Sequence, residues 1–306
     1  MRIMRVLGIL GLLVVPMFLF VSSAAVAQSS IEDALKQLTG DNGKGYMQPF
    51  ADDFGANMNA GFYHSAAIPV LGFNIEFDII AMGAMVTDDQ KTYDAKTPEG
   101  FTPATFKTAT LFGGEGTTVT DQTDPVPPYP SYRGADGVIN TTFIPLAVPQ
   151  LTVGSVFGTQ ALIRYVPLPN FQDASPKSTL FTFGIRHSVS QWFPVIPLDV
   201  SASIFFSSYK AGDLIDFKGT SFGAQASKAF SVVTVYGGLA YESTTLKLNY
   251  TYTGSTTPEN VSIELNGANT FRVTAGLGLN LGIFKVFADA NFGKVTHFSG
   301  GIGFGG

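Results

Sequence analysis

The residues of this chain with the chemistry for a functional site are ten ionisable side chains on the polar side of alternating segments. Apolar and polar residues alternate there with a spacing of two, which places them on opposite faces of a β-strand. On the inner face of a barrel, such charges either form ion pairs that fill a narrow lumen or set the selectivity of a pore. The ten candidates for lining a lumen are Glu76, Asp78, Arg164, Arg186, Glu242, Lys247, Arg272, Lys285, Asp289 and His297.

Two of these candidates, Arg164 and Arg186, fall on neighbouring predicted strands. Two guanidinium groups side by side could hold one anionic head group. The structural alternative is that the arginines pair with the carboxylates of Glu76, Asp78 or Asp289. The sequence leaves both alternatives open, and it also leaves open whether the lumen is filled by ion pairs or conducts.

Patterns that resemble catalytic or nucleotide-binding motifs lack the context that those motifs need. Residues 219–223 have the form Gly-x-Ser-x-Gly, but a strand pattern rather than a helix follows them. Residues 301–306 match a dinucleotide fingerprint in letters only. His64, His187 and His297 have no second His or Cys at metal-ligand spacing. We therefore expect no metal, no cofactor and no enzyme activity; the alternative is a lipid hydrolase or protease at a barrel rim, with one histidine as base.

The elements that must position the charges are strands, and they are clearest in residues 269–304. Three short segments there carry apolar side chains on one face and polar or very small ones on the other. Strand-like alternation begins near Ala56 and is dense from Leu151 onward. We predict an all-β fold, a transmembrane antiparallel β-barrel of about 10–14 strands, with about 12 as the best guess. The last three strands would form its closing edge.

The composition favours a membrane as the solvent for one face of the sheet. Charged residues make up 13% of the chain, about half of the usual quarter in soluble domains. The polar faces carry mainly Ser, Thr, Gly, Asn and Gln, which suits a confined interior. Cysteine is absent, which excludes disulfides and thiol chemistry. The net charge of −5 argues against a nucleic-acid partner.

The chain divides into an export signal, a short helical segment and the barrel. Arg2 and Arg5 precede an apolar stretch, and the small residues 25–27 follow it, so residues 1–27 read as a signal peptide cleaved after Ala27. Residues 28–55 form a helical or plug segment, with a helix from Ser30 to Leu38 that Gly40 ends. Residues 56–306 form the barrel. Residues of about 87–150 form a long loop region, with 106–112 as a possible strand inside it.

Aromatic residues near the predicted strand ends indicate where the membrane boundaries would lie. Tyrosine and tryptophan are enriched at both interfaces of membrane barrels. Aromatic residues of an ordinary core would give the same pattern. The candidates are Trp192, Tyr209, Tyr241, Tyr250 and Tyr252.

Several sequence runs resemble one family across most of the exported chain. They are residues 45–50, 59–66, 183–194, 226–228 and 234–241, and the third contains the pattern Arg-His-x-x-x-Gln-Trp. In these runs the chain resembles a family of exported Gram-negative envelope proteins known as a domain of unknown function. The layout of that family is loosely similar to outer-membrane barrels of the fatty-acid-transporter type. The resemblance implies an outer-membrane barrel and assigns no binding residue.

These observations together predict an outer-membrane, porin-like barrel that acts as a passive channel or transporter for small or hydrophobic molecules. Passage would follow the polar lumen, or an apolar ligand would diffuse sideways into the bilayer. The expected partners are outer-membrane lipid, the barrel-assembly machinery and a small or hydrophobic ligand. Besides the rim enzyme, the alternative is a structural barrel with a plugged lumen.

Overall fold

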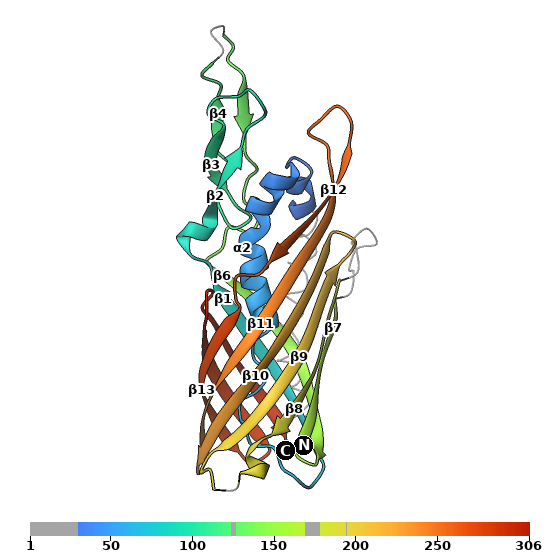
Figure 1. Ribbon diagram of the computed structural model, residues 1–306, viewed down its shortest axis with the longest axis vertical. Coiled ribbons are helices and arrows are strands. Elements are labelled where there is room, and N and C mark those ends of the chain that lie inside the picture. Colours follow the sequence, from blue (N-terminus) through green and yellow to red (C-terminus); the bar gives the residue numbers. More distant parts are fainter. Residues whose placement is uncertain (1–29, 124–126, 169–177, 194) are drawn as a thin grey trace, which may run out of the picture.

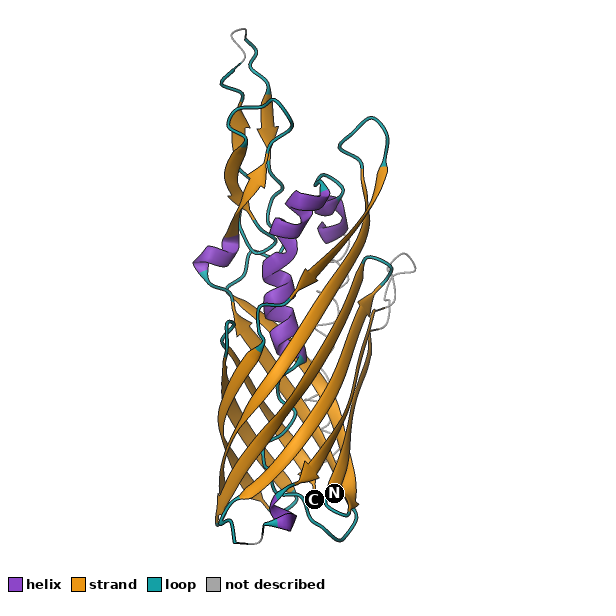
Figure 2. Cartoon of the chain, in the orientation of Figure 1, coloured by secondary structure: helices purple, strands orange, loops and turns teal. Residues whose placement is uncertain are grey.

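In the described part of the chain, ten antiparallel strands close into a barrel, and a helix enters it from one end (Figures 1 and 2). The computed structural model describes residues 30–123, 127–168, 178–193 and 195–306. The predicted signal peptide and the cleavage site after Ala27 lie outside these residues. Among the described residues, no helix is long and apolar enough to cross a membrane.

The barrel closes between strands from opposite ends of its sequence. The ten strands are β1 (Asn74–Met85), β6 (Phe143–Val156), β7 (Thr159–Leu168), β8 (Ser178–Ser188), β9 (Asp199–Ala211), β10 (Ile215–Phe230), β11 (Val233–Tyr252), β13 (Phe271–Leu281), β14 (Phe284–Phe292) and β15 (His297–Gly305). β1 pairs with β6 on one side and with β15 on the other, from Glu76 opposite Gly305 to Ala84 opposite His297. The prediction of an antiparallel barrel is confirmed, with β13–β15 leading to its closing seam.

The best guess of twelve strands was wrong for two physical reasons. The alternation before and after residues 243–245 was read as two strands, but β11 runs through them as one strand of 20 residues. Residues 106–112 were read as a strand of their own, and the segment there, β3 (Thr105–Ala109), pairs only with β2 (Thr92–Lys96) outside the barrel. A period of two reports which face a residue is on, and it does not report where a strand ends.

The two faces of the barrel differ as the alternation predicts. On β1, Glu76 and Asp78 are buried inside, whereas Ile75 and Phe77 are exposed on the outside. On β15, Phe298, Ile302 and Phe304 are likewise exposed. The outer surface is therefore an apolar band of the kind that faces lipid, and the charged groups are kept inside.

The helix in the lumen, α2 (Gly40–Met58), is longer than the sequence suggested and begins elsewhere. Residues 30–35 are helical, as expected for the first part of 30–38. Gly40, however, begins a new helix rather than ending one, and the strand-like pattern expected from Ala56 is absent because β1 begins only at Asn74. Gly40 was expected to end the first helix because glycine is common just after a helix C-terminus.

Two of the four glycines of α2, Gly43 and Gly55, are explained by its close approach to the barrel wall. A Cβ on Gly55 would lie 2.6 Å from the hydroxyl oxygen of Thr244 on β11, and one on Gly43 would lie 2.5 Å from the phenol oxygen of Tyr250. The glycines lower the intrinsic helix propensity of α2, but they allow the helix to lie close against the inner wall. Its stability rests on this tertiary packing rather than on its own sequence.

The main apolar core lies between α2 and the inner face of β10 and β11. Phe50 and Phe54 of α2 contact Phe217 of β10, with ring centroids 5.5 Å and 5.0 Å away respectively, and Phe54 also contacts Tyr209 of β9 at 4.9 Å. Leu246 and Leu248 of β11 complete this core and are fully buried. The upper lumen is therefore a packed hydrophobic core rather than an open passage.

A long extension, residues 86–142, stands above the barrel at the end where α2 enters (Figure 1). It contains η1 (Asp88–Lys91), β2, β3, β4 (Thr118–Thr120) and β5 (Ser131–Arg133), while β12 (Glu259–Asn266) lies against the upper part of β11. The loop region predicted to reach residue 150 ends earlier, because residues 143–150 belong to β6. Pro145 and Pro149 are tolerated in β6 because β7 pairs with it only from Gln150 to Val156.

Asp53 connects α2 to the base of this extension. Its side chain is buried, and its Oδ1 accepts a hydrogen bond of 2.8 Å from the amide of Gln90 in η1. Its Oδ2 has no partner among the described residues. Burial of this carboxylate raises the pKa of Asp53 to about 7.

We expect this carboxyl group to make the stability of the protein depend on pH. Because its pKa is raised on folding, the folded state binds more protons than the unfolded state between about pH 4 and pH 7. Asp53 should therefore lower the free energy of unfolding by up to about 1.4 kcal/mol for each pH unit as pH rises through this window. The midpoint of guanidinium unfolding, measured from pH 4 to pH 8, should depend less steeply on pH in D53N than in the parent protein. The exposed D41N variant is the control, and an equally steep profile in D53N would contradict the assignment.

Candidate functional site

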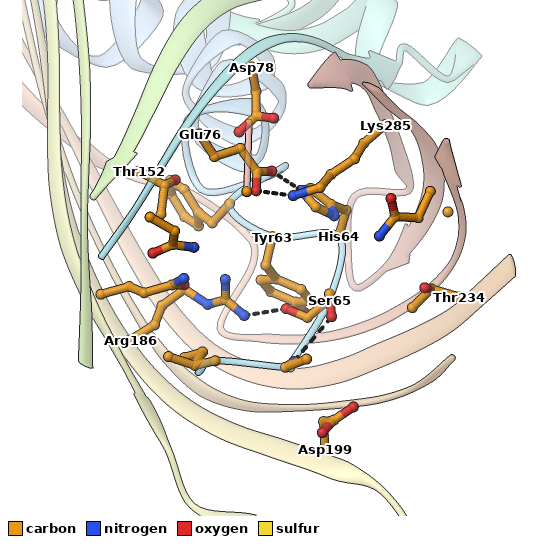
Figure 3. A pocket seen from close by; sticks show the side chains of 18 of the residues that line it. Tyr63, His64, Ser65, Glu76, Asp78, Thr152, Arg186, Asp199, Thr234 and Lys285 are labelled. Atoms are coloured by element: carbon orange, nitrogen blue, oxygen red, sulfur yellow. Dashed lines mark hydrogen bonds and ion pairs between the residues drawn. The ribbon is translucent and has the colours of Figure 1, made fainter. Parts of the chain in front are cut away.

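The candidate site is a polar pocket of about 440 Å³ in the lower lumen, beneath α2 (Figure 3). It lies at the end of the barrel where short turns join the strands, such as residues 157–158 and 231–232. One wall is the chain segment that leads from α2 to β1, residues 59–73, called here the lower plug. The other walls are barrel strands. Its main polar residues are Tyr63, His64, Ser65, Glu76, Asp78, Gln150, Arg186 and Lys285.

Arg164 of β7 ties the lower plug to the barrel wall. Its guanidinium group is fully buried and donates to the backbone carbonyls of Ala60 at 2.9 Å and Gly61 at 2.6 Å. It also donates to Gln150 of β6 at 2.9 Å and lies 4.4 Å above the ring of Phe62. A buried arginine is stable only when its donors find acceptors, and here the plug backbone supplies two of them.

Arg186 of β8 makes a second tie lower in the lumen. It donates to the backbone carbonyl of Ser65, and its guanidinium carbon lies 5.6 Å from the ring centre of Tyr63. Ser227 of β10 holds the same turn, since its hydroxyl accepts a hydrogen bond of 2.9 Å from the amide of Ala66. Both arginines suggested as an anion site thus contact plug carbonyls, and among the described residues neither forms a direct ion pair with a carboxylate.

Glu76 of β1 is the centre of the charge cluster in the pocket. One of its oxygens contacts the imidazole of His64 from the plug, and the other accepts from the ammonium group of Lys285 on β14 (Figure 3). The His64 ring stacks on Phe287 with centroids 4.6 Å apart. Asp78, one inward position further along β1, accepts a hydrogen bond of 3.2 Å from Gln150. His64, Glu76 and Asp78 could hold a metal ion, because one ligand atom from each lies within 4.8 Å of the others.

The remaining inward candidates form polar contacts elsewhere in the wall. Arg272 of β13 lies 3.5 Å from a carboxylate oxygen of Glu242 on β11, and both are buried. Asp289 of β14 accepts hydrogen bonds from Tyr236, Asn291 and Ser299. His297 is fully buried and donates to the carbonyl of Val295 at 3.3 Å. Those contacts match the ion-paired or hydrogen-bonded interior more closely than an open pore lining.

Lys247 is the exception among the ten charged candidates, because it points outward. It lies on the upper part of β11, where it pairs with Glu264 of β12 at 3.1 Å. The inward side chains of this segment are Leu246 and Leu248. The sequence reading was wrong by one position, since β11 continues without a break from residue 242 and even-numbered residues face inward throughout.

Only two of the five proposed interface aromatics lie on the outer surface. Trp192, in η2 (Ser190–Trp192), and Tyr241 are exposed. Tyr209, Tyr250 and Tyr252 instead pack inside against the core around α2, and Tyr250 donates to the carbonyl of Leu38 at 3.1 Å. These three were misassigned because alternation does not show which inner residues the helical segment packs against.

The Arg-His-x-x-x-Gln-Trp run has a structural role on both sides of the wall. Arg186 points inward to the plug, while His187 points outward beside the Thr159 hydroxyl at 2.9 Å and the Gln191 amide at 2.8 Å. The run thereby fixes the end of β8 and the turn that follows it. Ser221 of the Gly-x-Ser-x-Gly pattern is buried within β10, so its backbone is a strand and not a nucleophile elbow.

The contribution of the lower plug was missed by reasoning on strand periodicity. Tyr63, Ser65 and the carbonyls of Ala60 and Gly61 are contacts that alternation cannot indicate, because the segment has no regular structure. One signal was present: residues 59–66 are among the runs that carry the family resemblance. Gln150 was also missed, although it lies on the polar face of β6, in register with both Asp78 and Arg164.

We expect Arg164 to control how tightly the lower plug is held. Each hydrogen bond from a charged donor has a net value of about 1.5–3 kcal/mol, so losing two should raise the population of released plug by more than about tenfold. The chain has no cysteine, and Ala60 is fully buried. A60C should therefore react slowly with a maleimide, and A60C/R164M at least about tenfold faster.

The matched control removes an arginine that does not touch the plug. Arg133 lies in the outer extension, where it pairs with Asp136 at 2.7 Å and is half exposed. A60C/R133M should label at the rate of A60C alone. Equal rates in A60C and A60C/R164M would show that Arg164 does not hold the plug.

Comparison with known proteins identifies the family and adds little beyond it. Comparison with curated proteins gives no match. Among solved structures, the chain is similar to the attachment invasion locus protein Ail of Yersinia pestis, with 13% identity and a TM-score of 0.28, covering 76% of this chain and 97% of that one. It is also similar to the Ralstonia pickettii toluene transporter TbuX, with 8% identity and a TM-score of 0.23, covering 89% and 98%.

A mutant of the Rh. blastica porin gives 11% identity and a TM-score of 0.16, over 77% of this chain and all of that one. Identities and scores as low as these carry no argument about function. A family model, in contrast, matches nearly the whole chain, over residues 3–306. The chain therefore belongs to the family of unknown function DUF6588.

Proposed function

We propose that the protein spans the outer membrane as a barrel that its own N-terminal segment closes at rest. The apolar outer surface supports the membrane location, because charged groups are kept inside and residues such as Phe77, Ile185 and Phe298 face outward. The short turns at the pocket end fit the periplasmic side, and the extension above α2 fits the cell exterior. Exported chains reach this membrane through a cleaved signal of the kind predicted for residues 1–27.

The observation that carries the proposal is the plug inside the lumen. α2 packs against the upper wall through aromatic contacts, and the lower plug is tied to Arg164 and Arg186 below it. Passage of a small molecule along the lumen therefore requires the plug to move. The polar pocket of about 440 Å³ under the plug is a compartment into which such movement would open. The function proposed is gated passive passage of small molecules.

The wall itself supports a sideways route for hydrophobic molecules. β6 pairs with β1 along its whole length, but its pairing with β7 stops at Gln150 opposite Arg164. Beyond that point Pro145 and Pro149 have no N–H to donate, so they cannot extend the pairing. An incompletely paired seam next to apolar residues such as Val148 and Val166 is a place where an apolar ligand could leave for the bilayer.

A second candidate function is a purely structural barrel, and the buried arginine contacts favour it. Each arginine that leaves a plug carbonyl loses a charge-assisted bond in a low-dielectric interior, which opposes opening. Neither candidate includes a catalytic step. The two candidates differ in one measurable property, which is whether solute passes when the plug is free to move.

A disulfide between plug and wall tests the gating function directly. The hydroxyl oxygens of Ser65 and Ser227 are 3.3 Å apart, which is close enough for two cysteines to bond after small adjustments. If the plug must move, oxidised S65C/S227C should lower solute flux into proteoliposomes by at least about tenfold, and reduction should restore it. Swelling rates of liposomes containing the purified protein measure this flux.

The single variants S65C and S227C, assayed with and without reductant, are the controls and should behave like the parent protein. Flux that is the same in the oxidised and reduced double variant would overturn plug gating. A parent protein without any flux would favour the structural barrel. The membrane location is checked separately by fractionation: recovery in the soluble periplasm, without a heat-dependent gel shift, would contradict it.

A further inference from the structure

The cluster of His64, Glu76 and Asp78 brings together ligand atoms from two separate parts of the molecule. Glu76 and Asp78 are two residues apart on β1, so both side chains point into the lumen. His64 comes from the lower plug and faces them (Figure 3). One nitrogen of the histidine and one oxygen of each carboxylate lie within 4.8 Å of one another. An imidazole with two carboxylates is a donor set that divalent transition metals accept.

A second observation concerns an oxygen that has no donor. Asp78 is 1% exposed, and its Oδ2 accepts from Gln150, but its Oδ1 has no hydrogen-bond partner among the described residues. A buried carboxylate oxygen without a partner is costly. Both Asp78 Oδ1 and Glu76 Oε1 face the space beside Gly303 of β15, where a Cβ would overlap Asp78 Oδ1 and lie 3.5 Å from Glu76 Oε1. The missing side chain at Gly303 leaves that space free.

The arginines near the cluster donate to other acceptors and not to its carboxylate oxygens. Lys285 occupies Glu76 Oε2 and compensates one of the two carboxylates. Arg164 reaches Asp78 only through Gln150, to which it donates, and Arg186 donates to the carbonyl of Ser65. One unpartnered carboxylate oxygen, Asp78 Oδ1, therefore remains near a histidine nitrogen. That combination is what a cation would complete.

We propose that His64, Glu76 and Asp78 form a binding site for a divalent transition-metal ion of the Zn²⁺ type. The three side chains would supply one nitrogen and two oxygens, and the pocket would leave a further position for water. Ca²⁺ fits less well because it needs six to eight oxygen ligands. Because His64 belongs to the plug and the carboxylates belong to the wall, the ion would join the lower plug to β1. Binding of the ion does not depend on whether the barrel transports anything.

Isothermal titration of the folded protein in detergent with Zn²⁺ tests the site. We expect one ion per chain, and affinity weakened by at least about 100-fold in H64A and in D78N, since losing a ligand costs more than losing one of its supporting contacts. H187A removes a histidine outside the pocket and should bind like the parent. Ca²⁺ should give no saturable binding at comparable concentrations.

A pair of glycine variants tests the geometry without removing a ligand. G303A should weaken Zn²⁺ binding by at least about tenfold, because its methyl group displaces Asp78 Oδ1. G114A, in the extension above the barrel, is the control, because an added carbon there meets no atom within 4 Å. A heat-dependent gel shift confirms that each variant is folded. Parent protein that fails to bind one Zn²⁺, or H64A that binds like the parent, would overturn the proposal.

Discussion

The buried guanidinium group of Arg164 is the interaction on which the arrangement of plug and barrel depends. A guanidinium group buried inside the wall is stable only when its N–H groups have hydrogen-bond acceptors. Irregular backbone inside a lumen is stable only when its carbonyl groups have hydrogen-bond donors. Arg164 and the carbonyls of Ala60 and Gly61 meet both needs at once. Neither part would be satisfied without the other, so the lower plug is an integral part of the barrel rather than a ligand of it.

The lumen has two layers with different physical chemistry. In the upper layer, Phe50 and Phe54 of α2 pack against Phe217 and its neighbours, where the gain comes from apolar burial and close contact. In the lower layer, the plug is held by hydrogen bonds and charges around Arg186 and Glu76. The apolar contacts of a packed core are lost together when the helix moves. Individual hydrogen bonds, in contrast, can be replaced one at a time by hydrogen bonds to water. Movement is therefore easier to start in the lower layer, and passage along the whole lumen also requires α2 to leave its apolar contacts.

Much of the barrel could be read from the sequence because its strands obey a local rule. Alternation placed Glu76, Asp78, Asp289 and most other charges on the inner face, and it indicated the closing strands. It misplaced Lys247 and split β11, because a period of two carries no information about strand ends. The helix from Gly40 and the roles of the lower plug depend on contacts with residues such as Thr244 and Arg164, far away in the chain. No pattern within one segment reports such contacts, so the centre of the site could not be derived locally.

The pairing of β1 with β15 has a consequence for the order of assembly. β1 follows the plug directly in the chain and pairs with β15, so the ring cannot close until β15 has been delivered. Pairing between segments so distant in sequence is slow, because chain entropy is lost before the contacts form. Until then the ring has two open edges through which the plug can be laid against the wall. The plug can therefore pack against the barrel wall in the interval before β15 pairs with β1.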